Sequence, residues 1–292
     1  MLQGGAAGCR NGAFHKEATM IHPTAIVEKG AELGDGVEIG PYAFVGAKAK
    51  VGDRCRLGMH SMVMDYTSLG ADCVLHPGAV LGDLPQDLGY KGWPSFLEVG
   101  EGCEFREFAT VHRGAAEGSV TRIGNHVYMM ATSHAGHNAQ VGDHVVMANG
   151  ALLAGHVVVG DHCFLGGTSA IHQFCRLGRY VMICGVMGVG QDVPPFCTTF
   201  TQGEGGIVSG LNVVGLRRGG FTPEQRLKIK RAYDTVYRKG LNARQAREAL
   251  EAMAAEGNEF AKEYADFIAG SKRGLASCCF RKEHGRLGGG DE

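Results

Sequence analysis

A group of histidines lies between residues 112 and 172, where residue types and spacing best suit chemistry. Its members are His112, His134, His137, His156 and His172. A neutral imidazole is the most usual general base near pH 7, although a single histidine is more often a packed or solvated residue. The sequence has no GxSxG nucleophile motif and no phosphate-binding P-loop. The group therefore favours proton abstraction from a substrate over covalent catalysis.

A shared metal is the main competing use of these side chains. The His134-x-x-His137 spacing turns the two rings to opposite faces of an extended chain, so a common metal would need a corner between them. No aspartate or glutamate lies in the same stretch, and CxxC pairs are absent. We therefore expect neither a metal nor another cofactor.

The elements that would position the histidines are predicted by an aliphatic residue at every sixth position. The first run comprises Val27, Leu33, Ile39, Val45, Val51, Leu57, Val63, Leu69, Leu75 and Leu81. The register returns at Val99, Phe105 and Val111 and then continues from Ile123 to Val189. Glycine often follows the aliphatic residue, and it tolerates the dihedral angles of tight corners. A strict period of six is typical of a solenoid whose flat sides each turn one apolar side chain inward.

Three hexads would close one triangular coil, so residues eighteen apart should stack in parallel strands. The solenoid is expected over residues 20–200, with a loop at 83–98 that holds the only tryptophan. Whether this loop is a solvent flap or carries function stays open. A shorter break at 113–120 is interpreted as a simple bulge of chain. His137 and His156 are nineteen apart, which predicts neighbouring positions on adjacent coils.

A helical domain is predicted after the solenoid, within residues 201–275. Thr222-Pro223-Glu224-Gln225 has the form of a capping box with proline in the first turn, and Asn242 is a second candidate cap. A third helix is expected from Glu259 to Ile268. These helices would cover the open end of the solenoid. Residues 1–19 and 276–292 are expected to be a disordered extension and a disordered tail.

Composition excludes several classes of protein. The net charge is −1 and no long basic run occurs, so nothing points to nucleic acid. No apolar stretch is long enough to span a membrane. The ten cysteines are scattered, and several occupy repeat positions as small apolar residues, which favours a reducing cytoplasm.

Several motifs occur in one order and carry a family resemblance. They are Ile21-His22-Pro23-Thr24-Ala25-Ile26-Val27, Gln86-Asp87-Leu88 with Tyr90, Val111-His112-Arg113-Gly114, His134-x-x-His137, Leu153-Ala154-Gly155-His156, Ala170-Ile171-His172-Gln173-Phe174, Gln191-Asp192-Val193-Pro194-Pro195, Gly210-Leu211-Asn212 and Gly215-Leu216-Arg217-Arg218. Over residues 20–275 the chain resembles the acyl-carrier-protein–UDP-N-acetylglucosamine O-acyltransferases, which begin lipid A biosynthesis. The resemblance implies a left-handed parallel β-helix with a C-terminal helical domain, assembled as a cytoplasmic homotrimer.

The resemblance also implies roles for individual residues. His137 would be the general base that activates the sugar 3-hydroxyl for attack on a 3-hydroxyacyl thioester of acyl carrier protein, and the Gly155 N–H would stabilise the oxyanion. The residues implied in substrate positioning are Asp87, His134, His156, His172 and Gln173, with Asn212 and Arg218 at the nucleotide end. Gly185 matches the position whose side-chain size limits acyl length, so its lack of a side chain favours a longer chain.

The chain departs from the family pattern at Asn138, where several relatives carry aspartate, at Gly89, where relatives commonly have lysine, and at Val214, where some members have an acidic residue. Acylation of a 3-amino sugar stays open beside O-acylation. The sequence is also compatible with the later N-acyltransferase of the pathway, with a zinc carbonic anhydrase of the same coil, and with a non-catalytic scaffold. The N-acyltransferase carries an extra N-terminal uridine-binding domain, for which the early start of the hexads leaves no room.

Overall fold

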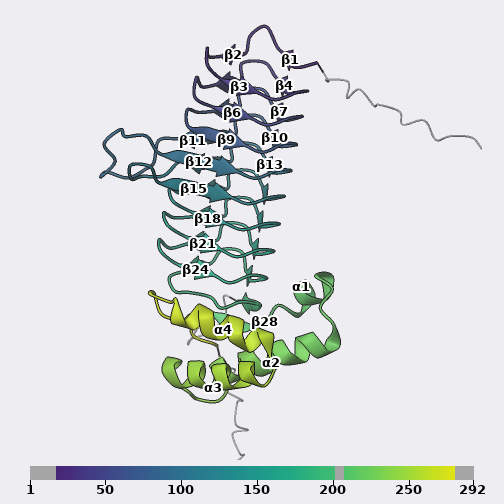
Figure 1. Ribbon diagram of the computed structural model, residues 1–292, viewed down its shortest axis with the longest axis vertical. Coiled ribbons are helices and arrows are strands. Elements are labelled where there is room, and N and C mark those ends of the chain that lie inside the picture. The colour runs from purple at the N-terminus through teal and green to yellow at the C-terminus, as the bar shows by residue number, and fades with distance from the viewer. Residues whose placement is uncertain (1–17, 201–206, 280–292) are drawn as a thin grey trace, which may run out of the picture.

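The hexads fold into a stack of triangular coils, each built from three short strands. The structure is a computed structural model, and it describes residues 18–200 and 207–279. Strands from successive coils pair into three sheets that form the walls of the stack (Figure 1). Pairing is parallel throughout the coils, as in Glu38↔Arg56 and Ile39↔Leu57. The predicted stacking of residues eighteen apart is therefore confirmed.

The three sheets are named A, B and C. Sheet A contains β1 Met20–Ile21, β4 Glu38–Ile39, β7 Arg56–Leu57, β10 Val74–Leu75, β13 Glu104–Phe105, β16 Tyr128–Met129, β19 Val146–Met147, β22 Phe164–Leu165, β25 Met182–Ile183, β27 Cys197–Thr199 and β28 Val208–Leu211. Sheet B contains β2 Ile26–Val27, β5 Phe44–Val45, β8 Met62–Val63, β11 Val80–Asp83, β14 Thr110–His112, β17 His134–Ala135, β20 Leu152–Leu153, β23 Ala170–Ile171 and β26 Gly188–Val189. Sheet C contains β3 Glu32–Leu33, β6 Lys50–Val51, β9 Thr67–Leu69, β12 Phe96–Val99, β15 Val120–Ile123, β18 Gln140–Val141, β21 Val158–Val159 and β24 Arg176–Leu177.

The second residue of most of these strands is the aliphatic residue of the hexad, and it points into the coil. Val45, Val63 and Leu81 are all 0% exposed. Removal of these side chains from water is the main driving force for stacking the coils. Since most inward positions lie at the end of a two-residue strand, the residues that follow are free to turn the corner and present their side chains outward.

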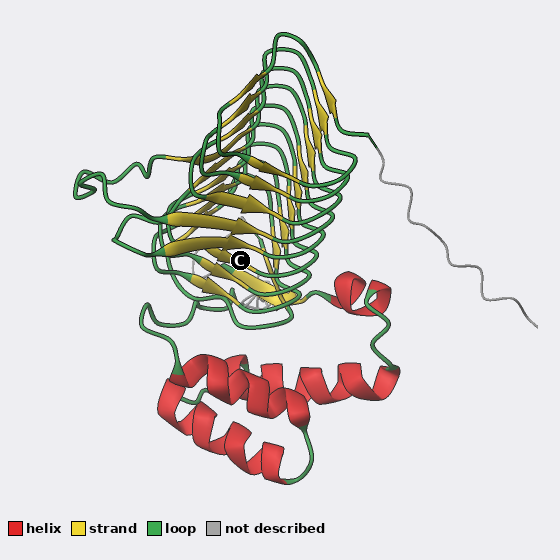
Figure 2. Cartoon of the chain, turned by 45° about the horizontal axis from the view of Figure 1, so that its top comes forward, coloured by secondary structure: helices red, strands yellow, loops and turns green. Residues whose placement is uncertain are grey.

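Two inserted segments leave the coils next to each other. The first lies between β11 and β12 and projects from the stack (Figure 2), and the second lies between β14 and β15. Backbone hydrogen bonds join them: the Gly114 N–H donates to Phe96 O at 3.2 Å and the Gly118 N–H to Pro94 O at 2.8 Å. The segment at 113–120 is thus a support for the longer loop, and its interpretation as a simple bulge was wrong.

In the part of the chain that the structure describes, four helices follow the coils: α1 Val213–Arg218, α2 Pro223–Tyr237, α3 Ala243–Ala255 and α4 Glu259–Ala269. Thr222 and Asn242 both form capping boxes, as their sequences predict, whereas the hexad pattern gave no sign of α1. The helices lie at the end of the stack (Figure 1). There, Arg179 of the last coils forms a bidentate ion pair with Glu263 of α4. Within the described segments, no helix is long and apolar enough to cross a bilayer.

The end of the described chain differs from the expected disordered tail. Ala276 is 0% exposed, and its N–H donates to Asp192 O at 2.8 Å. Cys279 N–H donates to Val208 O at 2.9 Å, next to a bridge between Val208 and Cys278. Residues 276–279 are therefore held against the last coils. The expectations for residues 1–17 and 280–292 lie outside the described residues.

Candidate active site

A groove of about 740 Å³ lies on the outer face of sheet B, over β14, β17, β20, β23 and β26. Its walls are largely apolar, and its polar side chains are Gln86, His112, His134, His137, His172 and Gln173. Apolar grooves with a few convergent polar groups are the usual form of small-molecule sites. Most of the histidines singled out from the sequence thus lie in one crevice, while their individual roles stay predictions.

His137 is held in one tautomer by its neighbour Asn138. Its Nδ1 lies 3.0 Å from Asn138 Oδ1, and the Ala115 N–H donates to the same oxygen at 3.0 Å. Because a backbone N–H can only donate, the atom that it meets must be the amide oxygen. His137 Nδ1 must then carry a proton, so in the neutral ring the lone pair is on Nε2. This is the form that a general base requires.

Three groups surround His137 Nε2. Asp87 Oδ2 lies 3.9 Å from it, and the Gly89 N–H fixes this carboxylate by donating to Oδ1 at 2.8 Å. Gly155 approaches from the next coil so closely that a Cβ built on it would lie 2.5 Å from Nε2. The His156 ring meets the His137 ring edge to face, 5.2 Å between centroids. No described residue accepts a hydrogen bond from the Gly155 N–H.

The expectation that His134 and His137 face opposite ways was wrong. Strand β17 ends at Ala135, and the chain turns a corner before His137, so both rings line the same groove. A corner between the two residues is what a shared metal would need. Among the described residues, however, no group of three or more His, Cys, Asp or Glu side chains is arranged to hold a metal ion.

Burial keeps the deeper histidines neutral. Desolvation, followed by the nearby rings of His112 and His137, lowers the pKa of His134 to about 4, although Thr110 Oγ1 hydrogen-bonds its Nδ1 at 2.8 Å. The pKa values of His112 and His156 are lowered for the same first reason, the loss of water around the charged form. His112 and His134, which line the groove, are therefore neutral imidazoles near pH 7.

The depressed pKa of His134 predicts a loss of stability in acid. Below its ordinary value of 6.5, the unfolded chain binds a proton that the folded chain resists until about pH 4. The contribution of neutral His134 to the free energy of unfolding is therefore complete above pH 6.5. It is lost as pH falls toward 4, and the loss is roughly 2–3 kcal/mol. Urea unfolding at pH 7 and 4.5 measures this loss. His134→Asn, whose amide can keep the Thr110 hydrogen bond, should lose less stability, and equal losses in both proteins would contradict the assignment.

The residues expected at the nucleotide end do not line this groove. Asn212 and Arg218 line a second groove, of about 550 Å³, on the outer face of sheet A beside α1. The Asn212 side chain caps α1 by accepting from the Gly215 N–H at 2.9 Å, and its Nδ2 donates to Tyr180 O at 2.9 Å. Val214, one of the departures from the family pattern, is exposed in the same groove.

Gly185 lines neither groove. It is exposed at the corner between β25 and β26, beside Gly167 of the preceding coil. Among the residues that line the sheet B groove, His112 and Gln86 received no role from the sequence. The signal for both was present, since His112 belongs to the histidine group and Gln86 precedes Asp87 in the loop motif.

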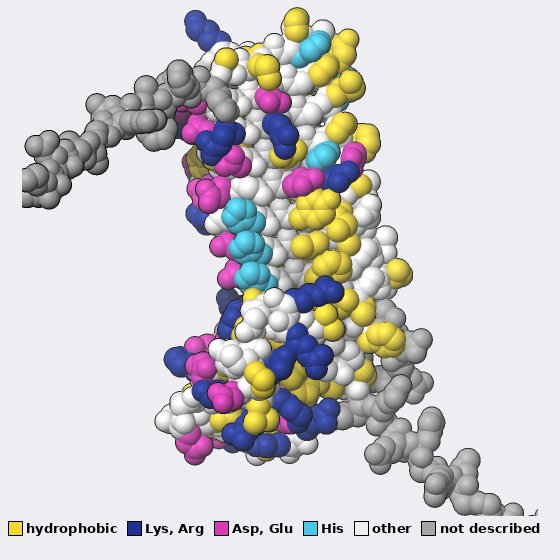
Figure 3. All heavy atoms as spheres, turned by 90° about the vertical axis from the view of Figure 1, so that its right-hand side faces the viewer, with side chains coloured by type: hydrophobic (Ala, Val, Ile, Leu, Met, Phe, Trp, Pro, Cys, Tyr) yellow, Lys and Arg dark blue, Asp and Glu magenta, His cyan; other side chains and the backbone are white. Residues whose placement is uncertain are grey.

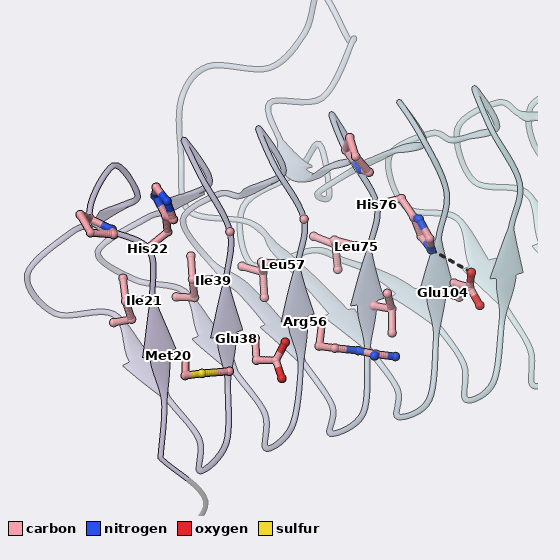
Figure 4. Close-up of a pocket in the computed structure, with 15 residues that line it drawn as sticks. Met20, Ile21, His22, Glu38, Ile39, Arg56, Leu57, Leu75, His76 and Glu104 are labelled. Atoms are coloured by element: carbon pink, nitrogen blue, oxygen red, sulfur yellow. Dashed lines mark hydrogen bonds and ion pairs between the residues drawn. The ribbon is translucent and has the colours of Figure 1, made fainter.

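Other concentrations of ionisable side chains lie away from the groove. A hollow of about 800 Å³ crosses the N-terminal strands of sheet A (Figure 4), where His76 Nε2 pairs with Glu104 Oε1 at 2.9 Å. A column of histidines follows one edge of the coils (Figure 3), with ring centroids 5.0 Å apart for His126–His144 and 4.8 Å for His144–His162. These imidazoles pair with a carboxylate or stack on each other, whereas His137 presents Nε2 to a groove.

Comparison with known proteins agrees with the resemblance inferred from the motifs. A family model described as UDP-N-acetylglucosamine O-acyltransferase, domain 2, matches residues 192–276, and one described as hexapeptide repeat of succinyl-transferase matches residues 48–83. The acyl-[acyl-carrier-protein]–UDP-N-acetylglucosamine O-acyltransferase of Halorhodospira halophila is 46% identical over 259 residues, which cover 88% of this chain and 99% of the relative. The protein of that name from Anaeromyxobacter sp. strain K is 45% identical, over 87% and 98% of the two chains.

Solved structures give the same result. The UDP-N-acetylglucosamine acyltransferase of Francisella novicida matches with a TM-score of 0.85 and 36% identity, over 89% of this chain and 94% of that one. The enzyme from Moraxella catarrhalis matches with a TM-score of 0.82 and 36% identity, over 87% and 98%. The predicted left-handed parallel β-helix with a helical C-terminal part is confirmed. Identity of this extent over nearly the whole length shows that the chain belongs to the acyl-[acyl-carrier-protein]–UDP-N-acetylglucosamine O-acyltransferase family.

Proposed function

We propose that this protein transfers a 3-hydroxyacyl chain from acyl carrier protein to the 3-hydroxyl of UDP-N-acetylglucosamine, the first step of lipid A biosynthesis. The observation that carries the proposal is the His137 site, in a chain 46% identical to an enzyme of that name. Its Nε2 has a lone pair because Nδ1 is bound to Asn138, and it lies at an apolar groove suited to an acyl chain. A sugar hydroxyl is a weak nucleophile, and such a base is what it needs.

In the proposed reaction, His137 Nε2 takes the proton of the sugar hydroxyl as its oxygen forms a bond to the thioester carbon. The Gly155 N–H donates to the carbonyl oxygen as charge develops there, a preorganised electrostatic effect. The carbon–sulfur bond then breaks, and the proton passes from His137 to the departing thiolate. The products are the O-acylated sugar nucleotide and acyl carrier protein with a free thiol. Every bond and proton in this reaction is accounted for without a cofactor.

Substrate positioning is assigned to the residues around this centre. Asp87, 3.9 Å from Nε2, is placed to hold a sugar group beside the base and to balance the imidazolium charge. His134, His156, His172 and Gln173 are proposed to contact the sugar and acyl groups. Asn212 and Arg218 are proposed to hold the nucleotide, since a diphosphate needs cationic or amide donors.

A homotrimer would join the two grooves, which occupy different walls of one chain. Outward side chains of sheet C form ion pairs such as Lys50–Glu32 at 3.0 Å and Arg122–Glu98 at 2.9 Å. Sheets A and B also expose apolar side chains, among them Met62, Leu152 and Phe164. Apolar side chains gather on the face seen in Figure 3. We propose that sheet A of one copy packs on sheet B of the next in a closed ring. The unpaired thiols of the described cysteines fit the reducing cytoplasm as its location.

A long acyl chain, of the 3-hydroxymyristoyl kind, is the proposed donor because Gly185 has no side chain. Gly185→Met would fill the volume at this corner, and the preferred donor should become shorter by several methylenes, with kcat/KM for the longest chain falling on the order of tenfold or more. Rates with 3-hydroxyacyl donors of graded length measure this shift. An unchanged preference would remove Gly185 from the acyl site.

The proposed activity is tested by incubating the purified protein with 3-hydroxyacyl-acyl carrier protein and UDP-N-acetylglucosamine. We expect one free thiol for each sugar nucleotide acylated, and a product whose acyl group is released by mild alkali because it is an ester. An alkali-stable product formed only from the 3-amino sugar would instead indicate N-acylation. No transfer to either sugar would refute the proposal.

A further inference from the structure

One indole connects the long inserted loop to the side chain that orients His137. Trp93 is half-buried, and its Nε1–H donates to Ala115 O at 2.9 Å. The N–H of the same residue, Ala115, donates to Asn138 Oδ1 at 3.0 Å, and this oxygen also receives the bond from His137 Nδ1. The contacts form a chain of hydrogen bonds from the loop to the imidazole.

Both ends of this chain are fixed to the coils. The Asn138 N–H donates at 2.7 Å to Oγ1 of Thr121, which is 0% exposed, and Asn138 occupies the corner with a φ of 62°. On the loop side, Tyr90 Oη donates to Trp93 O at 2.8 Å, and the buried Arg113 donates to that same Tyr90 oxygen at 3.2 Å. These hydrogen bonds therefore fix the position of Trp93 within the loop.

An asparagine amide differs from a carboxylate because only one of its two ends can accept a hydrogen bond. If Asn138 were flipped, its NH2 group would meet the Ala115 N–H, and two donors would face each other. His137 Nδ1 would then have to accept, and the proton would move to Nε2, where it would block proton abstraction. The position of the Ala115 peptide thus decides which nitrogen of His137 is basic.

We propose that Trp93 and Asn138 are positioning residues: through the Ala115 peptide they fix the amide of Asn138 and, with it, the reactive tautomer of His137. This inference rests on the proposed role of His137 as general base. It explains how asparagine serves beside the base where relatives carry aspartate. The amide sets the tautomer, and the carboxylate of Asp87, 3.9 Å from Nε2, supplies the negative charge from the other side.

The decisive variant is Trp93→Phe, which keeps an aromatic ring and removes the single N–H donor. In this variant we expect kcat to fall about 3–10-fold at nearly constant KM. In Asn138→Ala we expect kcat to fall further, on the order of 10²-fold, because a catalytic histidine in the wrong tautomer is a much weaker base. Asn138→Asp should recover most of the rate and move the acidic limb of the pH profile to higher pH, since a second negative charge favours the imidazolium.

The tautomer itself is read by ¹⁵N NMR of histidine-labelled protein, with His137→Gln to assign the signals. Wild type should show a protonated Nδ1 and an unprotonated Nε2 at His137, and both Trp93→Phe and Asn138→Ala should show a mixture. Tyr237→Phe is the matched control: it removes one aromatic donor to a backbone carbonyl, Ala276 O at 3.1 Å, in the helical domain. It should leave the tautomer and the pH profile unchanged.

Wild-type NMR signals and kcat in Trp93→Phe would overturn the role of Trp93, and an unchanged tautomer in Asn138→Ala would overturn the whole inference. The NMR measurement needs no substrate. It therefore separates failure of this inference from failure of the proposed acyl transfer, which would appear as an inactive wild-type protein with the expected tautomer.

Discussion

Replacement of His137 by alanine is expected to lower kcat for acyl transfer by roughly 10²–10⁴-fold, the usual contribution of a general base. The variant keeps the groove but has no lone pair at the position of Nε2, so the sugar hydroxyl must lose its proton to water. KM for both substrates should change little, because the imidazole acts mainly as the proton is transferred. Steady-state rates of thiol release measure both constants.

The control for this variant is His144→Ala, which removes an exposed imidazole from the histidine column along another edge of the coils. We expect it to retain the rate of the parent protein. Both variants should keep the circular dichroism spectrum and the oligomeric mass of the parent, because neither ring is in the coil core. A His137→Ala rate within about threefold of the parent would exclude His137 as the base.

Gly155→Ala is expected to lower kcat nearly as much as His137→Ala does, although it adds only one methyl group. The added Cβ would lie 2.5 Å from His137 Nε2 and 2.6 Å from Cε1, so the imidazole must move. The backbone of Gly155 is not in the left-handed region, and the fold should accept alanine without strain. Displacement of the base by about 1 Å is expected to cost on the order of 10²-fold in kcat.

Gly210→Ala is the matched substitution, because a Cβ built there meets nothing within 4 Å. We expect Gly210→Ala to keep the parent rate and melting temperature, and Gly155→Ala to keep the melting temperature alone. A crystal structure of Gly155→Ala should show the His137 ring rotated or shifted away from the new methyl group. Full activity with the ring unmoved would show that the close approach of Gly155 has no part in the reaction.

The coil could be predicted because its determinants are local in sequence. Each hexad contains its own inward aliphatic residue and its own corner, so the register from Val27 to Val189 needs no long-range information. The caps of α2 and α3 are local for the same reason, with Thr222 and Asn242 three residues before their glutamines. The prediction failed at residues 276–279, because buried Ala276 is held by hydrogen bonds to Asp192 and Tyr237, which are far away in the sequence.

The sequence by itself determined the repeat, the triangular stacking and the neighbouring positions of His137 and His156 on adjacent coils, since a period of six sets which residues stack. Only the tertiary structure decided that His134 and His137 line one groove and that Gly155 lies close to His137 Nε2. It also decided that hydrogen bonds through the Ala115 peptide connect Trp93 to Asn138. Those contacts depend on corner geometry and on two inserted segments that follow no period. Their positions come from hydrogen bonds between neighbouring coils, which no local pattern encodes.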